Sequence, residues 1–160
     1  MVNGGLILLS LHNLLRWAVV ILGVLAVGRA LSGWLGNRAF TTGDARLGML
    51  FTVFFDVQVL LGVLLYLVRG WGGVALSDIG AAMRDAALRF FAVEHIGLML
   101  VALVFTHIGR SLSKKAPEGI QKHRRAAIWF GAALLLTLAA IPWPFLSNGR
   151  PWFRLLGLQF

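Results

Sequence analysis

The 160-residue sequence contains no cysteine, which excludes disulfide frameworks, zinc–cysteine sites, iron–sulfur clusters and covalently attached haem. Acidic residues are also few, 6 in all, and charged residues of both signs make up only 13% of the chain. A disordered chain would need the opposite balance of charge and hydrophobicity. Because 59% of the residues are hydrophobic, the composition also excludes an ordinary soluble domain and predicts an all-α integral membrane protein.

Four stretches are long and apolar enough to cross the hydrocarbon core of a bilayer, which takes about 20 residues. They cover residues 8–31, 47–68, 90–110 and 125–146. The connections between them are short and leave no room for a second folding unit. The sequence therefore predicts a single membrane domain over residues 1–160, a four-transmembrane-helix bundle with up-down-up-down topology.

Two segments outside these stretches are expected at the membrane surface. Residues 77–88 have the composition of a short amphipathic helix, for which Ser77 is a candidate N-cap. The tail, residues 147–160, alternates apolar and aromatic residues around two arginines and suits a segment that rests on the bilayer.

Lysine and arginine predict the orientation of the chain, because cytoplasmic loops carry an excess of them. The connections on one side hold nine of these residues: Arg29, Arg38, Arg46, Arg110, Lys114, Lys115, Lys122, Arg124 and Arg125. The other side holds six: Arg16, Arg69, Arg84, Arg89, Arg150 and Arg154. Both termini are therefore predicted to lie outside the cytoplasm. Since the basic residues flank membrane stretches, the lipid bilayer is the predicted partner and nucleic acid is not.

Function is expected at the few polar side chains at membrane depth, since a central charge costs about 2.5 to 3.5 kcal/mol on insertion scales. These residues are His12, Asn13, Arg16, Asp56, Gln58, Glu94, His95 and His107.

His12 and His95 lie at similar depths on the first and third stretches. A rise of about 1.5 Å per residue places both in the outer leaflet, within about 5 Å of each other in depth. Two neutral imidazoles that face each other across a bundle are suitable axial ligands for one b-type haem. Arg16 and Arg89 are candidate partners for the haem propionates. The alternative is that each histidine bonds a neighbouring carboxylate or carbonyl group inside the bundle.

Asp56 lies near the middle of the second stretch, where an unpaired carboxylate is not sustainable. We expect a helix-to-helix hydrogen bond, made with Gln58 or a hydroxyl group. Pairing with Arg16 and a role as a proton or ion relay are the alternatives. Glu94 lies at a depth similar to that of Arg16, and a pair between these two residues would hold the first and third stretches together.

His107 is a supporting polar residue rather than an expected haem ligand. It is separated from His95 by about 120° around the helix, so the two do not share a face. The only partner for His107 in a second haem site would be His123, which we expect on a solvated cationic face in contact with anionic lipid.

Four segments of the chain resemble those of small bacterial four-span membrane proteins that are labelled cytochrome-b-like. The segments are 11–17, 90–95, 108–111 and 141–145, and the resemblance extends over nearly the whole chain. It implies haem b as the cofactor, His12 and His95 as its iron ligands, and a bacterial inner membrane as the location.

The sequence thus predicts a b-type haem-binding electron-transfer protein, with quinone as a candidate partner. A redox partner, a larger membrane complex and a second copy of the chain are further candidate partners. One alternative is an accessory subunit of a respiratory or photosynthetic complex that packs through its glycines and binds no haem. Another is a small transporter centred on Asp56. Whether the protein is an enzyme is left open.

Overall fold

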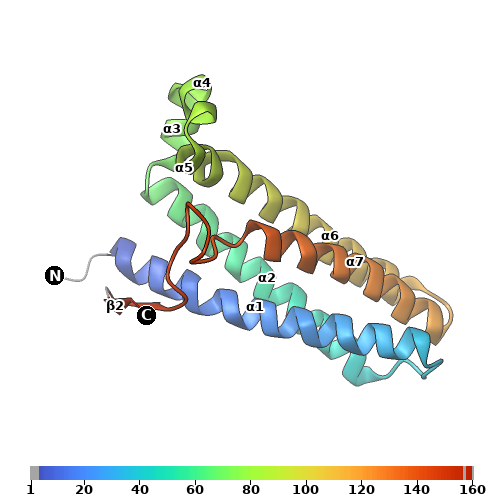
Figure 1. The fold of residues 1–160 in the computed structure, drawn as a ribbon. Coiled ribbons are helices and arrows are strands. Elements are labelled where there is room, and N and C mark those ends of the chain that lie inside the picture. Colours follow the sequence, from blue (N-terminus) through green and yellow to red (C-terminus); the bar gives the residue numbers. More distant parts are fainter. Residues whose placement is uncertain (1–3, 157, 160) are drawn as a thin grey trace.

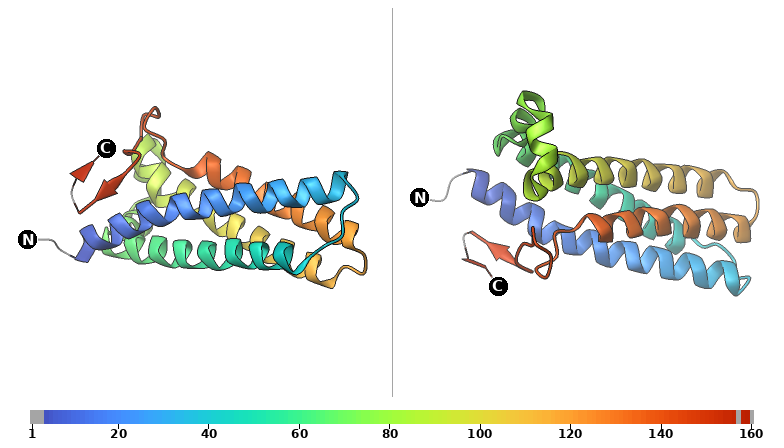
Figure 2. Two further views of the ribbon diagram at one scale, coloured as in Figure 1. Left: turned by 90° about the horizontal axis from the view of Figure 1, so that it is seen from below. Right: turned by 45° about the horizontal axis from the view of Figure 1, so that its top comes forward.

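The computed structural model describes residues 4–156 and 158–159. Four long helices contain most of them and pack lengthwise, α1 and α6 each contacting both α2 and α7 (Figure 1). They are α1 (Gly4–Leu35), α2 (Thr42–Val68), α6 (His95–Lys115) and α7 (Gly119–Ala140). Successive long helices run in opposite directions, so the start of α1 and the end of α7 lie at the same end of the bundle (Figures 1 and 2). The all-α prediction is confirmed, apart from a small antiparallel pair of strands, β1 (Arg154–Leu155) and β2 (Leu158–Gln159).

Three helical segments have the length and composition of membrane spans. They cover residues 4–35, 42–68 and 86–115, close to three of the four predicted stretches. The fourth long helix, α7, is less suited to span a membrane alone. Lys122, Arg124 and Arg125 occupy its first turns, and it ends at Ala140. Its apolar part, 126–140, rises only about 22 Å, less than a hydrocarbon core of about 30 Å.

The end of α7 has a local cause in the sequence. Ile141 is extended, with a ψ of 128°, and precedes Pro142, whose ring disfavours helical geometry in the residue before it. The predicted stretch 125–146 is therefore too long at its carboxyl end. Residues beyond Ala140 form turns, closed by a hydrogen bond from the Arg150 amide to the Pro142 carbonyl at 2.9 Å.

A series of short helices connects α2 to α6. These are α3 (Trp71–Ser77), α4 (Ile79–Arg84), α5 (Ala86–Arg89) and a π-helical turn, η1 (Phe90–Glu94). The prediction of one helix over 77–88 capped by Ser77 is wrong. Asp78 instead caps α4 by accepting from the Ala81 amide, and Asp85 caps α5 by accepting from the Leu88 amide, both at 2.8 Å. Each carboxylate satisfies a free amide at a new helix start and so divides the segment in two.

The π-helical turn η1 leads directly into α6 at His95, so the helical chain is continuous from 86 to 115. The hydroxyl of Tyr66, on α2, donates to the Ala92 carbonyl inside this turn at 2.9 Å. Such turns leave the regular helical hydrogen-bond pattern and often lie beside functional sites.

The core of the bundle is aromatic. Phe51, which is fully buried, contacts Phe55 and Phe130 edge to face, with ring centroids 5.9 and 5.4 Å apart. A Cβ at Gly109 would lie 2.8 Å from the Cβ of Trp129, so this glycine permits the close packing of α6 on α7. The phenylalanines fill the middle of the bundle and leave a cavity at each end.

The tail that follows α7 folds back onto α1. The Trp152 carbonyl accepts from the Arg16 guanidinium at 2.7 Å and from the Trp17 indole at 3.0 Å. Beyond it, the backbone amide of Arg154 donates to Asn13 at 3.0 Å and that of Leu156 donates to Ser10 at 2.9 Å. Polar side chains of α1 thus hold the tail in place.

Candidate functional site

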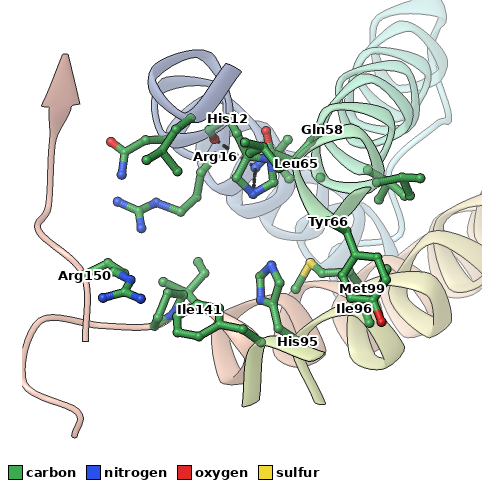
Figure 3. Close-up of a pocket in the computed structure, with 18 of the residues that line it drawn as sticks. His12, Arg16, Gln58, Leu65, Tyr66, His95, Ile96, Met99, Ile141 and Arg150 are labelled. Atoms are coloured by element: carbon green, nitrogen blue, oxygen red, sulfur yellow. Dashed lines mark hydrogen bonds between the residues drawn. The ribbon is translucent and has the colours of Figure 1, made fainter. Parts of the chain in front are cut away.

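A cavity of about 410 Å³ lies at the end of the bundle that holds the start of α1 and the tail (Figure 3). Residues of α1, α2, α6, α7 and the tail contribute to its lining, so segments far apart in the sequence form its wall. Its volume is in the usual range for small-molecule and cofactor sites. The polar side chains on its wall include His12, Arg16, Gln58, Tyr66, His95 and Arg150.

The two histidines predicted to act together do come together in this cavity. The ring centroids of His12 and His95 are 6.4 Å apart and their planes lie at 75°. His95 places its Nδ1 2.8 Å from the Ala140 carbonyl oxygen. Because a carbonyl only accepts, Nδ1 carries the proton and donates it, which leaves the Nε2 lone pair of His95 for a ligand.

His12 is held mainly by Gln58. The Gln58 amide donates to the backbone carbonyl of His12 at 3.0 Å and lies 3.4 Å from His12 Nε2, a long and therefore weak contact. His12 Nδ1 and Gln58 Oε1 are buried and have no hydrogen-bond partner among the described residues. A Cβ on Gly62 would lie 3.2 Å from His12 Cε1, so the glycine leaves room for the imidazole.

Arginines give the cavity a positive charge. Arg16 is buried, Arg69, Arg150 and Arg154 also contribute to the wall, and no Asp or Glu is present among the described lining residues. Arg150 lies over the Phe91 ring, 4.6 Å from its centroid. Partial burial, followed by the charges of Arg150 and Arg69, lowers the pKa of Arg154 from its ordinary value. The site therefore favours a ligand that carries negative charge.

Arg89 and Glu94 lie outside the cavity lining. Arg89 Nε donates to Glu94 Oε1 at 2.6 Å, so the expected Arg16–Glu94 pair is wrong and Arg89 is not positioned as a propionate partner. The π-helical turn explains the pairing, because residues five apart in such a turn are brought into register. Arg16 is occupied instead by the tail carbonyl of Trp152.

Asp56 and His107 form a pair with each other. Their Oδ1 and Nε2 atoms are 2.7 Å apart, and the two side chains are 42% and 53% exposed on the outer surface of α2 and α6. The predicted bonds of Asp56 to Gln58 or Arg16 are wrong. Residues two apart on a helix point about 200° apart, so Asp56 faces outward where Gln58 faces the cavity.

Several cavity residues were not identified from the sequence. Arg150 and Arg154 reach the site only because the tail returns to α1, a tertiary arrangement that no local pattern predicts. Arg69 follows the last residue of α2 at the cavity mouth. The one available signal was the unusual placement of arginines among the aromatic residues of the tail.

The described residues contain no group of three or more His, Cys, Asp or Glu side chains that could hold a metal ion unaided. His12 and His95 together have two imidazoles on the cavity wall, and two protein ligands are the number that a six-coordinate haem iron takes. Comparison of the chain with models of known families, with curated proteins and with solved structures found no match.

Proposed function

We propose that this membrane protein binds one b-type haem between His12 and His95 and transfers electrons. The observation that carries the proposal is the spacing of the two imidazoles, whose centroids are 6.4 Å apart across a cavity. Histidine nitrogens bind metals at about 2.0 Å, so two rings on opposite sides of one iron have centroids roughly 6 Å apart. The residues present therefore fit a bis-histidine haem.

The surroundings of the histidines support the same ligand. The Ala140 carbonyl accepts from His95 Nδ1 and so fixes the tautomer that leaves Nε2 free. Imidazoles that bind a metal through one nitrogen commonly donate from the other to a backbone carbonyl in this way. Arg16, Arg150 and Arg154 are the propionate partners that the geometry favours in place of Arg89. When bound, the haem supplies one-electron oxidation and reduction.

The chain itself has three tasks in this proposal. His12 and His95 hold the iron, and Gln58 gives up its long contact with His12 Nε2 while keeping its bond to the His12 carbonyl. The arginines balance the negative charge of the propionates. The tail covers the cavity and limits the access of water.

We infer that α7 completes an up-down-up-down bundle of four spans. It packs along both α1 and α6, which have the length and composition of membrane spans. Its basic first turns then lie among cytoplasmic headgroups. In this arrangement residues 1–160 form one domain in a bacterial inner membrane, with both termini outside the cytoplasm.

A visible spectrum of the purified protein tests the haem proposal. Protein made in haem-replete cells is expected to show a Soret band and, after reduction with dithionite, a sharp α band. His12→Ala and His95→Ala are each expected to abolish the low-spin bands. His107→Ala, on the same helix as His95 and bonded outside the cavity, is the matched control and should keep them. Wild-type protein without a Soret band, or a His95→Ala variant with unchanged bands, would rule out this site.

Quinone is the electron acceptor or donor that we propose for the haem, because a lipid-soluble carrier reaches a membrane site directly. Mixing the reduced protein with a short-chain quinone should reoxidise it within the dead time of manual mixing, whereas the quinone's non-redox dimethoxy analogue should not. Reoxidation no faster than that by buffer alone would remove quinone from the proposal and leave the haem site standing.

A second candidate function, an accessory subunit of a larger membrane complex, is favoured by one observation. Asp56 and His107 are half exposed near the middle of their helices, where lipid is a poor neighbour for a polar pair. A second chain packed on this face would cover the pair. The geometry gives less support to a transporter centred on Asp56, because Asp56 and Gln58 face opposite sides of α2.

The size of the complex extracted in a mild detergent tests the subunit function. Wild-type protein is expected to migrate with a partner or as an oligomer, and the Asp56→Asn plus His107→Gln variant to lose that association. Arg84→Gln, a change on the exposed helix α4, should leave it intact. A wild-type monomer would exclude this function.

A further inference from the structure

A second cavity, of about 330 Å³, lies at the opposite end of the bundle from the histidine pair. It is enclosed by the end of α1, the start of α2, the end of α6 and the start of α7. Its charged lining residues are Arg29, Asp44, Arg46, Arg110, Lys114 and Lys122. Neither the haem proposal nor the quinone proposal uses this cavity.

His123, on α7, forms part of its wall and is only 1% exposed. The expectation of a solvated position is wrong because Gly33, on α1, has no Cβ: one built there would overlap the imidazole, so the ring fits under α1. Phe40 covers the ring at a centroid distance of 4.9 Å. His123 Nε2 lies 3.5 Å from the Ala39 carbonyl, while Nδ1 is buried without a hydrogen-bond partner among the described residues.

The cations around His123 are not neutralised within the described chain. Asp44, the one acidic residue of the lining, is already paired with Arg29 at 2.8 Å. Four basic side chains are left without an ion-pair partner among the described residues: Arg46, Arg110, Lys114 and Lys122. Like charges held around one cavity repel, so a bound anion would lower the energy of the folded protein.

We propose that this cavity binds a phosphoryl group, carried either by the headgroup of an anionic phospholipid or by free phosphate. Arginine and lysine are the side chains that bind phosphate oxygens. The cavity lies at the ends of helices with the length and composition of membrane spans. Basic cavities between membrane helices on the cytoplasmic side are typical headgroup sites.

Native mass spectrometry of the full chain in a neutral detergent tests this site. The probes are cardiolipin and phosphatidylglycerol as anionic lipids, phosphatidylcholine as the zwitterionic control, and inorganic phosphate. We expect an anionic lipid or phosphate to remain bound under conditions that remove phosphatidylcholine. Retention of the lipid alone identifies a headgroup, and displacement by millimolar phosphate identifies a site for the free ion.

Charge-matched variants locate the binding. Arg46→Gln combined with Lys114→Gln is expected to weaken binding about tenfold or more, because charged hydrogen bonds are lost. Both side chains are exposed at the cavity rim, so folding should survive, which the thermal midpoint checks. Arg84→Gln combined with Arg124→Gln removes the same charge outside the lining and should change binding little. Equal retention of phosphatidylcholine, or equal loss in the two double variants, would overturn the proposal.

Discussion

Two histidines of this protein, the partly buried His12 and the buried His123, each lie against a glycine on a neighbouring helix. His12 on α1 lies over Gly62 on α2, and His123 on α7 lies over Gly33 on α1. In both places the missing Cβ provides the space that the imidazole occupies. Each ring also keeps a buried nitrogen without a partner among the described residues, so the glycines position rings that still have hydrogen-bonding capacity.

Gly33→Ala is expected to destabilise the protein by about 1 to 3 kcal/mol, because the new methyl group overlaps the His123 ring and forces the ring or α1 to shift. Gly28→Ala, on the same helix with nothing within 4 Å of its built Cβ, is the control and should be neutral or stabilising by up to about 1 kcal/mol. The free energy of unfolding in mixed detergent measures both. Equal stability of the two variants would show that α1 and α7 adjust freely.

Single residues also show where sequence reasoning succeeded. The proximity of His12 and His95 was predicted because depth along a helix follows from residue number. The direction in which a side chain points around the helix was harder to predict, because it depends on how the neighbouring helices pack. This direction decides whether a polar residue faces the core or the lipid. Asp56 was assigned partners at the right depth and on the wrong face, and its true partner is His107.

Among the elements, the tail after α7 has the largest effect on the site. It supplies Arg150 and Arg154 to the cavity wall and is fixed to α1 through four hydrogen bonds. The π-helical turn before His95 affects the site differently, because it pairs Arg89 with Glu94 and both residues lie outside the cavity lining. Neither effect has a clear sequence signature. The docking of the tail needs a long-range contact, and the pairing of Arg89 with Glu94 needs a change of helix type.

Ser10→Ala combined with Asn13→Ala is expected to release β1 and β2 from α1, because the amides of Leu156 and Arg154 lose their acceptors. Two such bonds contribute about 1 kcal/mol each, so the tail should open roughly thirtyfold more often. Limited trypsin cleavage between Arg154 and Leu155 reports the opening. Ser32→Ala, on the exposed surface of the same helix, is the control and should be cut at the wild-type rate. Unchanged cleavage of the double variant would mean that packing alone holds the tail.

At the scale of the whole molecule, hydropathy predicted the middle of the long helices and local chemistry decided their ends. The second and third predicted stretches lie inside helical segments 42–68 and 86–115. The carboxyl end of the fourth was overestimated by several residues because Pro142 stops α7. The side-by-side packing of α1 with α7, and the two cavities it helps to form, depend on contacts between residues far apart in the sequence, such as Gly33 and His123.

The orientation of the molecule can be tested without background, because the chain has no cysteine of its own. Ser147→Cys, at the end of the bundle that holds the histidine pair, should react with a membrane-impermeant maleimide added to intact cells. Asn37→Cys, in the exposed turn at the other end, should react only after the membrane is permeabilised. The reverse pattern would place both termini in the cytoplasm.

The return of the tail to α1 has a consequence for the order of events during synthesis. Residues 150–154 leave the ribosome after all four long helices, so the cavity between His12 and His95 remains open on one side until those residues dock. A ligand that enters during this interval needs no unfolding to reach its position. Once the tail has docked, a ligand meets a wall that includes Arg150 and Arg154, so docking of the tail changes the charge of the cavity as well as its shape.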